Sequence, residues 1–321
     1  MRLSLHYFRS QLLLFVALTL SLPATLKAET VHHIKTVFVI VMENHNWTGD
    51  GSLDIYNNPA APYINYTLLP EASYARDYNN PPGIHPSLPN YIYLEAGSSL
   101  GTKGYDGEPS QFRQSTTDHL TTLLEKAGIS WRAYDEDITG KTCPLTPEGP
   151  LDPNGSHLYQ PKHNPFVYFE DQTNDLSSGS AKCISHVRPF SQLDSDLANG
   201  TVARYNFITP NLCDDMHDSC SGDAITHGDT WLKEHLPAIL NSTAYRSGGA
   251  IFITWDEAAK GDGPIGMIVL SPYAKGNHYS NSTYYNHTST LRTLQEIFGV
   301  YPYIRYASSA TDLRDLFAVF P

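Results

Sequence analysis

Residues 36–42 read TVFVIVM, and the polar residues Glu43, Asn44 and His45 follow directly. After Thr36 the run is continuously apolar and largely β-branched, with no polar residue at alternate positions. Such a run predicts a strand that is covered on both faces, as in the interior of a parallel sheet. Ligands of parallel α/β sheets bind beyond the carboxyl ends of the strands. The stretch therefore predicts the fold class and places Glu43 where a site is expected.

Other short apolar runs predict companion strands, with helices between them. The expected strands are residues 130–134, 205–209, 250–255 and 266–270, and the expected helices are residues 118–127, 230–240 and 289–298. Thr288 or Ser289 would cap the last helix. Strands that alternate with helices predict an α/β fold, a three-layer sandwich around a mostly parallel central sheet. Because no internal repeat interrupts the pattern, we expect one domain.

The first 28 residues have the character of a signal peptide. Arg2 and Arg9 precede an apolar run over residues 12–22, and small residues up to Ala28 follow it. The run is shorter than the roughly 20 residues that a membrane-spanning helix needs, so we expect cleavage rather than an anchor. The predicted organisation is a signal peptide over residues 1–28 and one domain over residues 29–321, with no transmembrane segment and a secreted or periplasmic location.

The net charge excludes one class of partner. The formal charge is −12, and three positive charges would leave with the signal peptide. Binding to the nucleic-acid backbone draws on clustered Lys and Arg, so nucleic acid is not an expected partner. A phosphorylated substrate remains compatible, because a bound metal ion reverses the local sign of charge.

Four cysteines agree with export to an oxidising compartment. Cys213 and Cys220 would close a tight loop, and Cys143 and Cys183 a longer one. We favour this arrangement among the three pairings that four cysteines allow. A zinc site built from cysteine is the alternative, but the sequence has no CxxC spacing.

Acidic residues follow four of the predicted strands. Glu43 follows the first strand, and Asp256 and Glu257 follow residues 250–255; the other two strand ends carry the sequences DDMHD (214–218) and DED (135–137). Like charges gathered at one edge of a sheet repel one another, and a divalent cation relieves the repulsion. The competing interpretation, helix caps and solvated turns, is strongest for residues 135–137.

A second candidate is the segment HPSLPNY, residues 85–91. Ser87 lies between prolines and precedes a helix-compatible run, so it is expected at a helix N-terminus, where backbone N–H groups favour a phosphate. Ser87 could then attack phosphorus. Among 14 histidines, His85, His217 and His287 stand out by position, as groups that could protonate a leaving alcohol or hold a phosphate oxygen.

Six motifs in order resemble a known family. They are MENHNW (42–47), HPSLPNY (85–91), NFITPNLCDDMHD (206–218), ITWDE (253–257), IGMIVLSPY (265–273) and YNHTSTLRTLQEIFG (285–299). Together they resemble the bacterial phosphoesterase family of secreted acid phosphatases and phospholipases C, within the alkaline-phosphatase superfamily. The HPSLPNY segment and the DDMHD loop are similar to those of acid phosphatases that include phosphatidylinositol-3-phosphate phosphatases.

The resemblance implies a role for each matching residue. The implied nucleophile is Ser87, and the implied ligands of a divalent Ca, Mg or Zn ion are Glu43, Asn44, Ser87, Asp256 and Glu257. The implied substrate contacts are Asn44, Asn90 and His287, and the implied catalytic histidines are His85, His217 and His287. Many relatives carry Asp-Asp or Asp-His where this chain has Asp256 and Glu257. The resemblance therefore does not determine the identity or the number of the metal ions.

The expected function is therefore that of a secreted acid phosphatase acting on phosphate monoesters, with a phosphoinositide or another phospholipid head group among its candidate substrates. A phospholipase C, which cuts phosphodiesters, is the nearest alternative. A secreted binding protein without catalysis is the alternative from another class, and the intact Glu43, Ser87 and Asp256 speak against it. The sequence lacks the maturation motif of a sulfatase.

Overall fold

The computed structural model describes Met1 and residues 32–321, so the predicted signal peptide, apart from Met1, lies outside the described residues. The strands are β1 (Thr36–Met42), β2 (Ser73–Ala75), β3 (Tyr78–Asn79), β4 (Trp131–Asp135), β5 (Glu148–Leu151), β6 (His157–Tyr159), β7 (Val187–Pro189), β8 (Tyr205–Thr209), β9 (Gly249–Trp255), β10 (Met267–Leu270), β11 (Tyr279–Asn281) and β12 (Tyr285–Asn286). The helices are α1 (Leu69–Glu71), α2 (Ser87–Ala96), α3 (Pro109–Phe112), α4 (Leu120–Lys126), α5 (Glu170–Thr173), α6 (Ala181–His186), α7 (Leu193–Asn199), α8 (Ala224–Asn241), α9 (Thr243–Arg246) and α10 (His287–Phe298).

The central sheet confirms the predicted α/β class. Its eight strands run in the order β11-β2-β10-β9-β1-β8-β4-β7, with β1 at the middle, and all seven residues of the neighbouring β9 are buried. Strands β9, β1, β8, β4 and β7 are parallel to one another. Strand β10 runs antiparallel to β9 and β2, which the sequence did not predict. The connection from β9 to β10 contains no crossover helix, and only a crossover would return the chain in the parallel direction.

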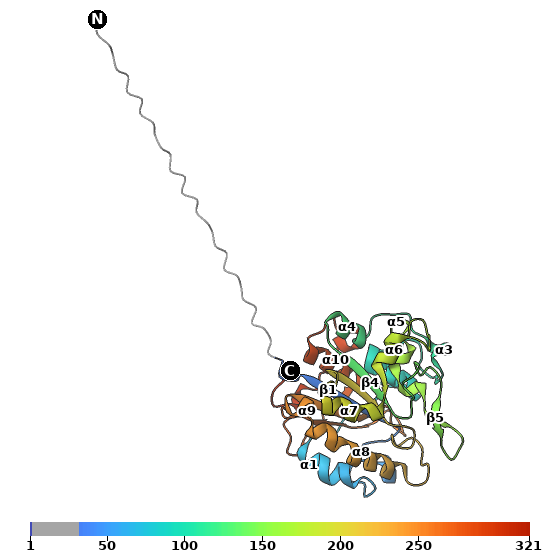
Figure 1. Ribbon diagram of the computed structural model, residues 1–321. Helices are drawn as coiled ribbons and strands as arrows, with labels where there is room; N and C mark the ends of the chain where they lie inside the picture. Colours follow the sequence, from blue (N-terminus) through green and yellow to red (C-terminus); the bar gives the residue numbers. More distant parts are fainter. Residues whose placement is uncertain (2–31) are drawn as a thin grey trace. The chain divides into compact units, whose positions relative to one another are not determined.

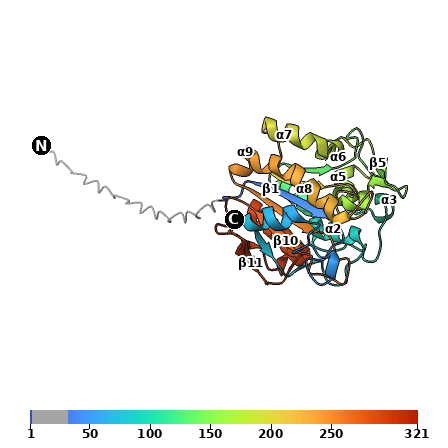
Figure 2. The same cartoon turned by 90° about the horizontal axis from the view of Figure 1, so that it is seen from below.

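Helices cover the two faces of this sheet. Figure 1 shows α4 and α10 on one side of β1 and α8 and α9 on the other. Helix α10 packs against α2 and α4, and α8 packs against α7 and α9, so each side has its own connected group. Figure 2 shows β10 and β11 on the opposite side of β1 from α6. The architecture is the three-layer sandwich that the alternation of elements predicts.

Helix boundaries follow the capping residues more closely than the apolar patterns. Helix α8 begins several residues before the predicted residue 230, because the Asp223 side chain accepts the backbone N–H of Thr226. Helix α10 is capped by Asn286, not by Thr288 or Ser289 as predicted. The Asn286 side chain accepts from the Thr288 N–H, and the Ser289 hydroxyl accepts from the Asn286 N–H. The sequence prediction missed this reciprocal cap.

Two disulfides connect Cys143 to Cys183 and Cys213 to Cys220, which confirms the favoured pairing. The second disulfide closes the DDMHD loop that follows β8. Within residues 32–321, no helix combines the length and the apolar character that crossing a bilayer requires.

Candidate active site

Strand register brings Glu43 and Asp256 together. Strands β1 and β9 pair in parallel, and their last partners are Met42 and Trp255, so the next residue of each strand emerges at the same edge. The Asp256 N–H donates to the Met42 carbonyl at 2.9 Å, and the Asn44 N–H donates to Asp256 Oδ1 at 3.0 Å. Both carboxylates are fully buried. The apolar strands therefore deliver two acids to one point, as the sequence predicts.

Ser87 lies at the N-terminus of α2, as predicted, and faces Glu43. Its hydroxyl donates to Glu43 Oε2 at 3.0 Å, and it is also close enough to Asp256 to lower the pKa of that carboxyl by hydrogen bonding. Gly97 ends the helix with φ 67°, where a Cβ would lie 2.7 Å from the Ile304 carbonyl oxygen. The first helical residue thus carries a hydroxyl at a point where backbone N–H groups lack helical partners.

Asp215, His163 and Tyr91 complete the surroundings of Glu43. The Tyr91 hydroxyl donates to Glu43 Oε1 at 2.6 Å, and its ring stacks on the His163 ring. His163 Nε2 lies 3.3 Å from Glu43 Oε1, and its Nδ1 lies 3.4 Å from Asp215 Oδ2. Asp215 is held by its own backbone carbonyl, which accepts the Glu43 N–H at 2.7 Å. These contacts join the end of β1 to the loop after β8.

One donor set in the described residues has the geometry of a metal site. A ligand atom from each of Glu43, His163 and His217 lies within 4.8 Å of the other two. Oxygen and imidazole donors of this kind suit a divalent cation. His217, expected as a catalytic histidine, thus lies beside His163, and its Nδ1 contacts the Asp218 carboxylate at 2.8 Å.

The buried polar atoms around Glu43 fit such a cation. Asp256 Oδ2, Asp215 Oδ2 and His163 Nε2 are buried without a hydrogen-bond partner. Burial raises the pKa of the Glu43, Asp215 and Asp256 carboxyls, and the neighbouring acids raise that of Glu43 further. Burial lowers the pKa of His163, which favours the neutral ring that binds metals. Orphaned acceptors with unfavourable buried charge are the environment that a cation stabilises.

Glu257 lies in a second group, with His85 and Asn90. Its Oε2 contacts His85 Nδ1 and accepts from Asn90 Nδ2 at 3.2 Å. His85 Nε2 lies 3.0 Å from Asp262 Oδ1. Burial and the Asp256 charge raise the pKa of Glu257 to about 9. The expected metal ligand Glu257 is therefore engaged by other side chains, an arrangement that suits positioning of His85.

His287 lies behind Asp256. It is fully buried, its Nε2 contacts the Asp256 carbonyl oxygen, and its Nδ1 lies 3.1 Å from the Tyr78 hydroxyl. Burial lowers its pKa to about 4. Both ring nitrogens contact protein groups, and His287 lies against the Asp256 backbone; its contact with phosphate stays a prediction. Asn44, whose backbone N–H contacts Asp256, has a half-buried side chain.

Sequence reasoning missed His163 and gave Asp215 no individual role. His163 belongs to the segment PKHNP inside the long loop 140–190, where no strand end or spacing distinguishes it. The length of that loop was the available signal, since long loops in compact domains are usually functional. Asp215 lies in the DDMHD loop that follows β8, so its position near the sheet edge was predicted but its contact with His163 was not.

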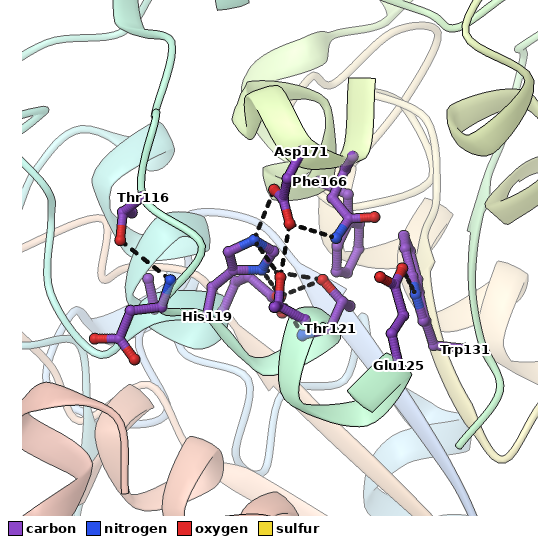
Figure 3. A network of polar contacts seen from close by, with 12 residues as sticks. Thr116, His119, Thr121, Glu125, Trp131, Phe166 and Asp171 are labelled. Carbon is purple, nitrogen blue, oxygen red and sulfur yellow. Dashed lines mark hydrogen bonds and ion pairs between the residues drawn. The ribbon is translucent and has the colours of Figure 1, made fainter. Parts of the chain in front are cut away.

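A separate buried polar cluster lies at the other end of α2. Glu95, one residue from the end of that helix, accepts from His119 Nδ1 at 2.9 Å, while Asp171 lies 3.0 Å from His119 Nε2. Figure 3 shows the His119 ring between Asp171 and Thr121. Burial alone would lower the pKa of His119, but hydrogen bonds to Asp171 and Glu95 raise it to about 9. The cluster ties α2 to α4 and α5.

Comparison with known families identifies relatives over most of the described chain. A model of the phosphoesterase family matches residues 46–264 and 261–301. A phosphatidylinositol-3-phosphatase from Mycobacterium tuberculosis is 28% identical over 282 residues, which cover 87% of this chain and 82% of the relative. A phosphate-repressible acid phosphatase from Penicillium chrysogenum is 27% identical over 67% of this chain and 50% of the relative. The chain spans about half the length of that fungal enzyme.

Solved structures share the fold. A phosphonate monoester hydrolase from Agrobacterium radiobacter superposes with a TM-score of 0.53 at 12% identity, over 89% of this chain and 78% of the other. A protein of the alkaline phosphatase superfamily from Vibrio parahaemolyticus gives a TM-score of 0.52 at 11% identity, over 84% of this chain and 67% of the other. At these identities the likeness shows the fold alone, which is the alkaline-phosphatase type that the motifs imply.

Proposed function

Because the chain belongs to the phosphoesterase family and is a phosphoric-ester hydrolase, we propose that it is an exported phosphomonoesterase with Ser87 as its nucleophile. One observation carries the proposal: the Ser87 hydroxyl donates to the buried Glu43 carboxylate at 3.0 Å, in the middle of an acid-rich cluster. A hydroxyl held at a helix N-terminus, beside groups that bind a cation, suits attack on phosphorus.

The proposed metal ligands are Glu43, His163, His217, Asp215 and Asp256. Asn44 and Glu257 are proposed as supporting residues rather than as direct ligands. Asn44 contacts Asp256, and Glu257 contacts His85. A bound divalent ion, whether Ca, Mg or Zn, would neutralise charge on the phosphate oxygens and stabilise the serine oxygen as an anion.

The chain's own residues position the nucleophile and transfer protons during the proposed reaction. Glu43 Oε2 orients the Ser87 Oγ through their hydrogen bond, and the Ser87 proton passes to that carboxylate oxygen as the new P–O bond forms and the ester P–O bond breaks. The departing alcohol takes a proton from a histidine or from water; His217 and His85 are the proposed donors. Water next cleaves the phosphoserine, which restores Ser87 and releases phosphate. Asn90 supports this geometry through its contact with Glu257.

The proposed substrate class is phosphate monoesters, with a phosphoinositide or another phospholipid head group as a candidate. Support comes from the acid phosphatases among the relatives and from the relative described as a phosphatidylinositol-3-phosphatase. Hydrolysis of p-nitrophenyl phosphate, compared with that of its choline diester, tests the class. The proposal expects the monoester to be the better substrate. A preference for the diester would make the protein a phospholipase C-type enzyme instead.

The nucleophile is tested with Ser87→Ala, for which we expect turnover to fall by roughly 10³-fold or more, as in other hydrolases that lose their nucleophile. Ser309→Ala, an exposed serine outside the site, is the matched control and should keep wild-type turnover. Rapid quenching with a labelled phosphate ester should also trap a phosphoserine in the wild type. Undiminished turnover of Ser87→Ala would remove Ser87 from the reaction.

Export is part of the same proposal. Two disulfides in the described chain favour an oxidising compartment, and residues 1–28 have the composition of a cleaved leader. We expect N-terminal sequencing of the protein from its native host to begin at Glu29. A mature chain that retains residues 1–28 would contradict the predicted cleavage.

A further inference from the structure

A cavity of about 450 Å³ opens beside the N-terminus of α2. Polar side chains supply most of its wall: Asp106, Glu108, Gln111, Gln160 and Lys162. The remainder holds a glycine, a serine and two prolines, and the proline rings are the apolar side chains of the wall. The cavity therefore offers several hydrogen-bonding groups, and it lacks the aromatic and branched aliphatic side chains that line most apolar pockets.

Asp106 connects this cavity to the nucleophile. Its Oδ1 accepts the backbone N–H of Leu88, the residue after Ser87, at 2.9 Å. Its Oδ2 accepts from Lys162 Nζ at 3.0 Å. A wall of the cavity thus touches the same helix turn that presents the Ser87 hydroxyl.

Lys162 connects the cavity to the carboxylate cluster from the other side. It directly precedes His163, and only 21% of its side chain is exposed. Its Nζ donates to Asp106 Oδ2 at 3.0 Å, so an ammonium group lies at the wall of the cavity, on the same segment as His163. A phosphate at Ser87 would meet this charge, and the ester's alcohol would extend towards the cavity.

The cavity's polar groups are fixed before any ligand arrives. The Glu108 carboxylate and the Gln111 amide oxygen hold each other's backbone N–H at the start of α3, which leaves the Gln111 NH₂ as a free donor. The Gln160 NH₂ donates to the His157 carbonyl at 2.8 Å, which leaves its amide oxygen as an acceptor. Two carboxylates and an amide oxygen supply acceptors, and the Gln111 NH₂, the Ser110 hydroxyl and the Lys162 ammonium supply donors beside them. Neighbouring hydroxyl groups are the ligands that such acceptors bind.

We infer that this cavity binds the alcohol part of the substrate and selects polyhydroxylated alcohols, such as a sugar or a cyclitol ring, over aryl and alkyl alcohols. The inference rests on the proposed function, because the alcohol must reach the cavity from a phosphate at Ser87. It gives Asp106, Glu108, Gln160 and Lys162 a role in choosing the substrate. The same chemistry occurs in a soluble sugar phosphate and in the head group of a phosphoinositide.

Steady-state kinetics on three esters test the inference. Glucose 6-phosphate supplies the soluble polyol, short-chain phosphatidylinositol 3-phosphate supplies the lipid head group, and phenyl phosphate supplies a reference without hydroxyls. The variants are Glu108→Gln, which keeps an acceptor for the α3 cap, and Gln160→Leu. Asp194→Asn, in a separate surface hollow, is the control. Thermal unfolding of each variant checks that the fold is kept.

We expect each variant to raise the KM of a polyol ester relative to the KM of phenyl phosphate by roughly 3–10-fold, the value of one lost hydrogen bond. The control should leave that ratio unchanged. The inference holds if either polyol ester shows the effect, and the responding ester identifies the source of the polyol. Unchanged ratios in both variants would overturn the inference and leave the proposed function standing. A wild type inert on all three esters would instead overturn the proposed function, and the inference with it.

Discussion

Helix α2 carries an ionisable cluster at each end, and the two clusters differ in how their charges are balanced. At its C-terminal end, the imidazole of His119 lies between the carboxylates of Glu95 and Asp171, with hydrogen bonds to both. At its N-terminal end, Ser87 donates to the buried Glu43, which lies beside two further buried carboxylates, and Asp256 Oδ2 and Asp215 Oδ2 have no hydrogen-bond partner.

The difference separates a structural cluster from a reactive one. Because both ring nitrogens of His119 face carboxylates, both must donate, and the ring is an imidazolium. That cluster places its two carboxylates on either side of a positive charge supplied by the chain, although Glu95 Oε2 itself has no hydrogen-bond partner. In the N-terminal cluster, Lys162 is the one ammonium among the groups that shift the pKa of Glu43. Its effect is smaller than that of burial and of the neighbouring carboxylates, so the pKa of Glu43 stays raised. Buried carboxylates that the chain leaves without a compensating positive charge can bind a cation, and the site can then bind an anionic substrate.

The largest expected effect comes from changing one acid to its amide at each end of α2. Asp256→Asn should lower kcat/KM on phosphate monoesters by roughly 10²–10³-fold, because it removes a proposed metal ligand. In the presence of a chelator, the same variant should be more stable than the wild type, with a free energy of unfolding about 1 kcal/mol higher. The reason is that a buried carboxylate without a compensating charge has been removed.

Glu95→Gln is the matched change at the other end, and we expect the opposite effect on stability. It removes one carboxylate from a balanced group and leaves His119 with a weaker partner. Unfolding in urea measures both variants under the same conditions. If the two amides shifted the free energy of unfolding in the same direction, the contrast between the clusters would be wrong.

An effect that depends on pH is expected from His119→Gln. The folded pKa of His119 is raised to about 9 from its ordinary value of 6.5. The stabilisation by protonated His119 is therefore full below pH 6.5 and is lost as the pH rises through about 9. A shift of this size is worth about 3 kcal/mol at most, so His119→Gln should cost about that much at pH 6 and far less at pH 10.

Urea unfolding of the wild type and the variant across that pH range measures the effect, with His157→Gln, an exposed histidine, as the control. A cost that does not change between pH 6 and pH 10 would show that His119 acts by packing on Phe169 rather than by charge.

The sequence predicted the parts of this molecule that depend on strand ends. The run TVFVIVM predicted β1, and the parallel pairing with β9 brings Glu43 and Asp256 to one edge as expected. The prolines around Ser87 predicted the start of α2. These features are local, or they follow from the general geometry of parallel sheets.

Features that depend on long loops were not predictable from the same patterns. His163 reaches Glu43 only because the loop between β6 and α5 folds back over the sheet edge, and no periodicity encodes that path. The reversal of β10 and the engagement of Glu257 by His85 also arise from tertiary contacts. The charge on His119 depends on two acids, 24 and 52 residues away, and nothing near it in the sequence indicates them.

Calorimetric titration of the chelated protein with Ca²⁺, Mg²⁺ and Zn²⁺ in turn measures the cation directly, and thermal unfolding of the same samples provides a second signal. We predict that one of these ions binds wild-type protein with a stoichiometry of at least one, and that 100-fold excess over its Kd stabilises the fold by about 2.7 kcal/mol. Asp256→Asn should bind it far more weakly. Absence of binding by all three ions, together with full phosphatase activity in chelator, would contradict the account.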